Sequence, residues 1–120
     1  MIRTLKKFSS IVHSYKVTKF EQFGHLFKIR VEVELIDGSK LFIRETIIGE
    51  KTRKYAYHWQ KGDGELLVRW DNAPDWEIST FPHHKHTGRN INVEPSHERT
   101  LEQVLQVIAA RIEKSSSDEN

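Results

Sequence analysis

Residues 26–35 read LFKIRVEVEL, and the chain continues IDGSKLFIRETI through residue 47. In the first stretch apolar and charged side chains alternate with a period of two. This pattern is typical of a β-strand with one face buried and one face in water. Leu41, Ile43 and Ile47 resume the apolar positions after the turn residues Asp37 and Gly38. The two stretches therefore predict an antiparallel hairpin.

The length of the hairpin loop fixes which residues pair. A two-residue loop at Asp37 and Gly38 would set Glu34 against Leu41, whereas pairing must put apolar residues opposite one another. A three-residue loop over residues 36–38, with Gly38 in the left-handed region, satisfies this requirement. It predicts the pairs Val33 with Leu41, Val31 with Ile43 and Ile29 with Glu45. The last pair leaves a carboxylate on the apolar face.

Residues 54–60 (KYAYHWQ) and 66–71 (LLVRWD) predict a second hairpin, joined by residues 61–64 (KGDG). A four-residue loop matches Trp59 with Leu66, Tyr57 with Val68 and Tyr55 with Trp70, which gives one aromatic face that we expect in the core. The opposite face then carries Lys54, Ala56, His58, Leu67, Arg69 and Asp71. Asp71 or Asn72 should bond to local backbone where the strand ends.

The remaining chain predicts one further clear helix and two short extended segments. Thr100 followed by Gln103 is a capping-box signature, and an apolar stripe follows at helical spacing: Leu101, Val104, Leu105, Ile108 and Ile112. Residues 11–20 and 77–81 are expected to be extended, while residues 2–8 fit either a short helix or an irregular arm. The predicted fold class is α+β, an antiparallel β-meander with the C-terminal helix on one face. We expect a single domain over residues 1–114 and a disordered tail over residues 115–120.

Composition excludes several classes of protein. The chain has 120 residues and no cysteine, which removes thiol nucleophiles, thiolate zinc sites and disulfides. Residues 1–8 lack the apolar run of a signal peptide and no stretch approaches a membrane span, so we expect a cytoplasmic protein without a membrane partner. Residues 1–99 carry 17 Lys and Arg against 13 Asp and Glu. A basic body permits a polyanionic partner such as RNA.

The predicted pairing gathers basic residues on the open face of the sheet. These are Lys28, Arg30, Arg44, Lys54 and Arg69, with His58 among them and Glu32 and Glu34 as the acidic exceptions. His58 is expected on a rigid strand against Arg44 and Arg69. The alternative interpretation is a surface histidine on a solvated sheet face.

Residues 81–86 read FPHHKH, which places three of the chain's seven histidines within four residues. On an extended segment His84 and His86 point the same way and can share a metal ion, whereas His83 points opposite. Imidazoles also transfer protons near neutral pH. The run is therefore a proton-transfer or phosphate-binding site, a metal site or a solvated loop, and the sequence leaves the three open.

The sequence resembles the TumE toxin family over most of residues 26–108. Three stretches carry the resemblance: residues 55–60 (YAYHWQ), residues 69–74 (RWDNAP) and residues 79–86 (STFPHHKH). Asp37-Gly38-Ser39, Arg44-Glu45 and residues 100–105 (TLEQVL) also match the family pattern. After NAP the family usually has a His-His-Pro-like segment, where this chain has DWE at residues 75–77. The resemblance implies a prokaryotic toxin encoded beside an antitoxin partner, and it leaves open a homodimer.

A small helix-and-sheet fold of this kind is similar to RelE-like and barnase-like ribonucleases, whose sites lie on the open sheet face. The leading hypothesis is a metal-independent endoribonuclease that needs no cofactor, because attack by the 2′-hydroxyl of RNA needs only a base, an acid and cations. His58 and one of His83, His84 or His86 would be base and acid, and Glu45 or Asp71 would orient an imidazole. Phosphate would be held by Arg44, Arg69 and Lys85, with Arg30 and Lys54 nearby. The rivals are a non-enzymatic RNA- or protein-binding growth inhibitor and a metal-dependent hydrolase built on His84 and His86.

Overall fold

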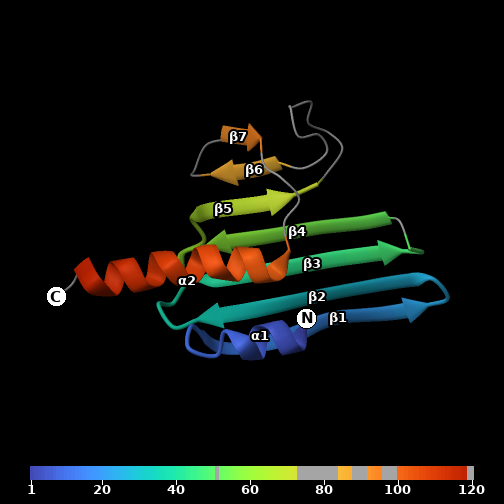
Figure 1. Cartoon of the computed structure of the whole chain (residues 1–120), viewed down its shortest axis with the longest axis horizontal. Coiled ribbons are helices and arrows are strands. Elements are labelled where there is room, and N and C mark those ends of the chain that lie inside the picture. Colours follow the sequence, from blue (N-terminus) through green and yellow to red (C-terminus); the bar gives the residue numbers. More distant parts are fainter. Residues whose placement is uncertain (51, 73–83, 88–91, 96–99, 119–120) are drawn as a thin grey trace.

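The computed structural model describes the backbone of residues 1–50, 52–72, 84–87, 92–95 and 100–118, and side chains within residues 1–50, 52–72 and 100–114. Its strands are β1 (Val12–Phe23), β2 (Leu26–Leu35), β3 (Lys40–Ile48), β4 (Thr52–Gln60), β5 (Leu66–Asp71), β6 (His84–Thr87) and β7 (Asn92–Pro95). They form one antiparallel sheet in the order β1 to β7, so each strand pairs with its neighbour in sequence. Helices α1 (Ile2–Lys7) and α2 (Leu101–Asp118) lie across this sheet (Figure 1). The predicted α+β meander with a C-terminal helix is confirmed.

The β2–β3 hairpin has the predicted register. Val33 pairs with Leu41, Val31 with Ile43 and Ile29 with Glu45. Leu35 N donates to Ser39 O at 2.9 Å, which closes a loop over residues 36–38. Gly38 has a φ of 87°, in the left-handed region that a residue with a Cβ rarely adopts. The three-residue loop chosen from the binary pattern is therefore the one that forms.

The core lies between one face of the sheet and the two helices. Buried residues of β2 to β5 join Leu5 of α1 and the predicted stripe of α2 in a single hydrophobic cluster. Both halves of the capping box form, since Gln103 N donates to Thr100 Oγ1 at 3.2 Å and Thr100 N donates to Gln103 Oε1 at 3.0 Å. An ion pair between Lys7 and Glu102 links α1 to α2. The N-terminal segment, for which the sequence left two options, is a helix with Leu5 buried.

The predicted register of the β4–β5 hairpin is wrong by two residues. Lys61 N donates to Glu65 O at 2.8 Å, and Gln60 pairs with Leu66. A β-bulge follows, so that Trp59 pairs with Val68 and Tyr57 with Trp70. A shift of two preserves the faces, and the aromatic residues are buried as expected. The bulge also brings Leu67, which was predicted on the open face, against the core.

Several predictions concern the ends of elements. The expected strand at residues 77–81 lies outside the described residues. The segment predicted as extended near residues 11–20 is β1, which continues to Phe23. The backbone of helix α2 runs to Asp118, four residues into the segment that we expected to be a tail. The assignment of residues 1–114 to a single domain stays a prediction. Neither described helix combines the length and apolar character needed to cross a bilayer.

Candidate functional site

The face of the sheet opposite the helices brings together polar residues from β2 to β5. In one row across the strands Arg30 pairs with Arg44, Arg44 with Ala56, and Ala56 with Asp71. In the next row the paired residues are Glu32, Phe42, His58 and Arg69. Directly paired residues of an antiparallel sheet point to the same face. The predicted clustering of Arg30, Arg44, His58 and Arg69 is thus what the backbone produces.

Two adjoining cavities hollow this face, with volumes of about 390 and 480 Å³. Both are lined by Arg30, Arg44, Ala56 and Arg69, so we describe them together as the open-face groove. Ala56 is the smallest side chain of its row, and it leaves room between the arginines. Phe42, His58 and Gln60 line the first cavity, whereas Lys28 and Lys54 line the second. The groove is therefore large enough for a molecule that binds the arginines and extends into both cavities.

The arginines and lysines outnumber the acidic residues that also line the groove, which are Glu32, Glu45 and Asp71. The pKa of Arg44 is lowered below its usual value by burial and by the neighbouring charges of Arg30 and Arg69. Among the described residues, no carboxylate forms an ion pair with Arg30 or Arg44. Guanidinium groups without a counter-ion favour an anionic ligand, and their planar donors fit phosphate oxygens.

His58 is held at both ring nitrogens. Its Nε2 lies 3.0 Å from Gln60 Oε1, and its Nδ1 lies 3.4 Å from Arg69 Nη1. A guanidinium can only donate, so Nδ1 accepts and the ring proton sits on Nε2. Burial lowers the pKa of His58 from 6.5, the bond to Gln60 acts in the opposite direction, and the charge of Arg69 lowers it further. The lowered pKa favours a neutral imidazole at pH 7, with its unprotonated Nδ1 beside Arg69.

At the end of β5, Asp71 holds Arg69 in place, and Asn72 ties the strand to β4. Asp71 is buried, and its Oδ2 accepts a bond from Arg69 Nε at 3.0 Å. Asn72 uses its side-chain amide to pair with β4, accepting from Tyr55 N at 2.9 Å and donating to Arg53 O at 2.7 Å. The expected backbone bonding by Asn72 is therefore seen, although its partners lie on the adjacent strand. Asp71 acts on Arg69, which in turn contacts His58.

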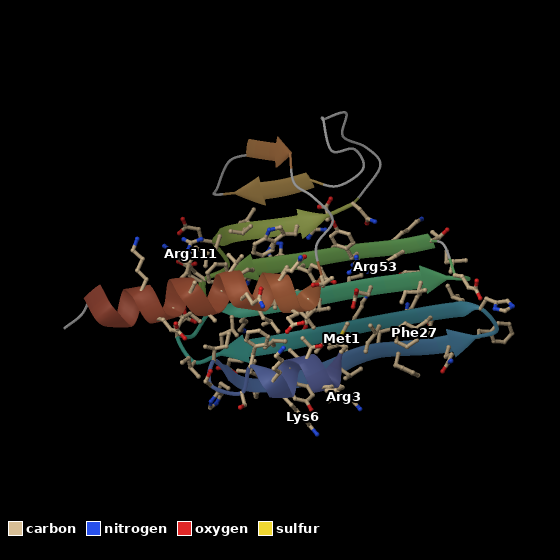
Figure 2. All side chains as sticks on the ribbon, in the orientation of Figure 1. Met1, Arg3, Lys6, Phe27, Arg53 and Arg111 are labelled. Carbon is tan, nitrogen blue, oxygen red and sulfur yellow. The ribbon has the colours of Figure 1, made fainter. Side chains whose placement is uncertain are left out.

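Glu45 lies on the opposite face of the sheet. Its Oε1 accepts bonds from Tyr57 Oη and from Arg53 Nη2, both at 2.8 Å. Burial, followed by the charge of Glu45, raises the pKa of Tyr57 above its usual value. Figure 2 shows Arg53 on the helix-bearing face, beyond the end of α2. The predicted role of Glu45 in orienting an imidazole stays untested, and the structure gives its carboxylate other partners.

The histidine run is described only in part. His83 lies outside the described residues, as do the side chains of residues 84–87. The backbone register pairs His84 with Asp71 and His86 with Arg69, so both positions extend the two rows of the open face. Lys85 pairs with Trp70, in a row of the helix-bearing face. The strand order thus brings residues 84–87 beside the groove, with His84 and His86 at the positions that adjoin it.

Sequence reasoning missed the two groove residues Phe42 and Gln60, which contact His58. Phe42 lies beside His58, with ring centroids 6.0 Å apart in an edge-to-face arrangement. The sequence does contain a sign of this residue. Phe42 is apolar, although the alternation of β3 predicts a polar residue between Lys40 and Arg44. Gln60 was missed because an amide at a strand end has no distinctive pattern. Within the part of the chain whose side chains are described, no three His, Asp or Glu residues are grouped to hold a metal ion.

Comparison with known proteins gives one match. The model of the family Toxin TumE matches residues 1–115, nearly the whole chain. No curated protein and no solved structure matches the chain. The match includes all of the groove residues, and it confirms the resemblance carried by the motifs around His58, Asn72 and the histidine run. This chain therefore belongs to the TumE family of toxins.

Proposed function

We propose that this toxin is a metal-independent endoribonuclease whose active site is the open-face groove. The observation that carries the proposal is a partly buried imidazole whose unprotonated Nδ1 lies 3.4 Å from Arg69 Nη1, in a cavity that Arg30 and Arg44 also line. A base beside a phosphate-sized cationic cluster is what cleavage by internal attack requires. The implied antitoxin partner would keep this activity in check.

In the proposed reaction His58 Nδ1 takes the proton of a ribose 2′-hydroxyl, and O2′ attacks the adjacent phosphorus. The bond from phosphorus to O5′ breaks, leaving a 2′,3′-cyclic phosphate, and an acid supplies a proton to O5′. The arginines stabilise the charge that develops on the phosphoryl oxygens. The acid is assigned to His84 or His86, because their register positions continue the rows of the groove.

Two residues position the reacting groups. Gln60 holds the Nε2 proton of His58, which keeps Nδ1 as the basic atom. Asp71 holds Arg69 next to that nitrogen. The contact of 3.4 Å between Arg69 and His58 is long for a hydrogen bond, so an incoming hydroxyl can replace it at little cost. Lys54 lines the groove farther along and would hold a neighbouring phosphate.

The test is RNA cleavage by purified, untagged protein with and without EDTA, using His58→Asn as the active-site variant. We expect full activity in EDTA and a loss of roughly 10²- to 10⁴-fold in His58→Asn, the range typical of a general base. His25→Asn, at an exposed histidine in the β1–β2 turn, is the matched control and should cleave like the wild type. Folded wild-type protein that cleaves no RNA would overturn the proposal.

A second function is supported by Arg30 and Arg44, which form no ion pair with a carboxylate of the described residues, since a cationic groove can arrest growth by binding RNA without cutting it. In that case His58→Asn would remain toxic in cells, whereas the double change Arg44→Glu and Arg69→Glu would abolish toxicity. The metal-dependent hydrolase predicts the opposite response to EDTA, with activity lost and then restored by a divalent metal. The analogy with RelE-like and barnase-like ribonucleases supports the enzyme only as a likeness of architecture.

A further inference from the structure

Phe42 is an aromatic side chain on the polar face of the sheet. It is half-buried, and it lies in the row formed by Glu32, His58 and Arg69 rather than in the core. The residues of β3 next to it on this face are Lys40 and Arg44, both basic, while apolar Ile48 lies at the far end of the strand. The register shows that Phe42 cannot contribute to the core under the helices. Its flat surface is available to a ligand in the groove.

The position of Phe42 relative to the arginines matches the two parts of a nucleotide. Phe42 and Arg44 are two residues apart on an extended strand, so their Cα atoms are separated by about 7 Å. Both line the same cavity of about 390 Å³, together with Arg30 and Arg69. A nucleotide presents a flat π-system at one end and a phosphate at the other. The cavity offers an aromatic ring for the first and guanidinium groups for the second.

We propose that Phe42 is a stacking platform for one base of a single-stranded RNA whose adjacent phosphate lies on Arg30, Arg44 and Arg69. This inference rests on the proposed function and names its substrate class. Bases of single strands are free to stack on protein aromatics, whereas those of a duplex stack on one another. The edge-to-face contact with His58 fixes the ring beside the proposed base catalyst. The stacked base would thus determine which ribose reaches His58.

The test compares two probes of equal length and charge. One is a single-stranded 2′-O-methyl oligonucleotide, which has bases but cannot be cleaved by 2′-hydroxyl attack. The other is an abasic oligonucleotide, which offers the phosphates alone. We expect the wild type to bind the first at least about tenfold more tightly, because stacking on an aromatic contributes roughly 1–3 kcal/mol per base. Fluorescence anisotropy gives both affinities.

The variants separate the platform from the cationic cluster. Phe42→Leu should bind both probes equally, Phe42→Trp should keep the preference, and Arg44→Gln should weaken binding of both. The ratio of the two affinities is insensitive to a fraction of unfolded protein. A wild-type ratio near one, or a ratio unchanged in Phe42→Leu, would overturn the stacking inference while leaving the ribonuclease proposal standing. If the wild type bound neither probe, the proposed function itself would fail.

Discussion

His58 owes its proposed role to its immediate neighbours. Most histidines on a sheet face are solvated and titrate near 6.5, where they are half protonated close to physiological pH. Here burial is the largest cause of a lowered pKa, Arg69 adds to the effect, and the bond to Gln60 acts against it. A lowered pKa keeps Nδ1 unprotonated at pH 7, which is the form a base requires.

NMR titration of His58 checks this electrostatic description directly. We expect an imidazole pKa below 6.5 in the wild type, and a higher value in Arg69→Gln because one cause of the lowering is removed. Since the folded state then binds fewer protons than the unfolded state, the stability contributed by neutral His58 is complete above pH 6.5 and is lost as the pH falls below it. A value at or above 6.5 would contradict the assigned protonation state.

Glu45 gives a second prediction at the scale of single residues. Glu45→Gln keeps the shape of the side chain but weakens the acceptor shared by Tyr57 and Arg53. We expect a loss of about 2 kcal/mol in the free energy of unfolding, because hydrogen bonds to a charged acceptor on the buried side are weakened. Urea denaturation measures this loss. Cleavage by the folded variant should be unaffected, and a collapse of activity with normal stability would instead make Glu45 part of the active site.

Among the elements, the C-terminal helix depends on local signals that are readable from sequence. Both capping-box bonds form between Thr100 and Gln103. Thr100→Ala should therefore cost about 1 kcal/mol of stability, or roughly 4 °C in the melting temperature, whereas Thr100→Ser keeps the accepting hydroxyl and should cost little. Thermal unfolding followed by circular dichroism distinguishes them. Equal losses in the two variants would show that the cap contributes nothing.

The two hairpins show how far the fold could be predicted. In β2 and β3 a slip of one residue would expose every apolar side chain, so alternation and Gly38 together determine the register. In β4 and β5 the error was two residues, which leaves the faces unchanged and gives no penalty that a binary pattern can detect. A β-bulge between Trp59 and Gln60 accompanies the packing of Leu67 against the core. Only the tertiary structure supplies that information.

The candidate site was predictable to a similar degree. The alternation of apolar and polar residues was enough to place four residues on one face of the sheet, because each lies on a strand with a clear period of two. These residues are Arg30, Arg44, His58 and Arg69. It did not reveal that Gln60 fixes the tautomer of His58. It also did not show that Glu45 bonds to Tyr57 and Arg53. These contacts depend on neighbouring strands and on the exact position of strand ends.

At the scale of the whole molecule, one face of the sheet forms the hydrophobic core and the other forms the proposed binding surface. One face packs on α1 and α2 (Figure 1). The opposite face carries the groove. Because the groove's cations belong to five different strands, β1 to β5, its ligand should be bound mainly through charge. We expect RNA affinity to fall steeply with salt, and the slope of log K against log salt to become shallower in Arg44→Gln than in the wild type. A slope independent of Arg44 would place the RNA elsewhere.

Filling the groove gives a test that leaves every charge in place. Ala56→Leu puts a larger side chain between the arginines on the floor of both cavities. We expect about a tenfold loss of RNA affinity, equivalent to roughly 1.4 kcal/mol, with thermal stability retained. The same change at exposed Ala110 of α2 is the control and should leave binding unchanged. Equal affinities for the two variants would argue against the groove as the binding site.

The most direct measurement of the central claim is the chemistry of the RNA ends after incubation with purified toxin in EDTA. Attack by the 2′-hydroxyl predicts products ending in 2′,3′-cyclic phosphate, with 5′-hydroxyl groups on the downstream fragments. These ends should be absent from parallel incubations with His58→Asn and present with His25→Asn. Fragments bearing 5′-phosphates, or intact RNA in the presence of folded wild-type protein, would contradict the account.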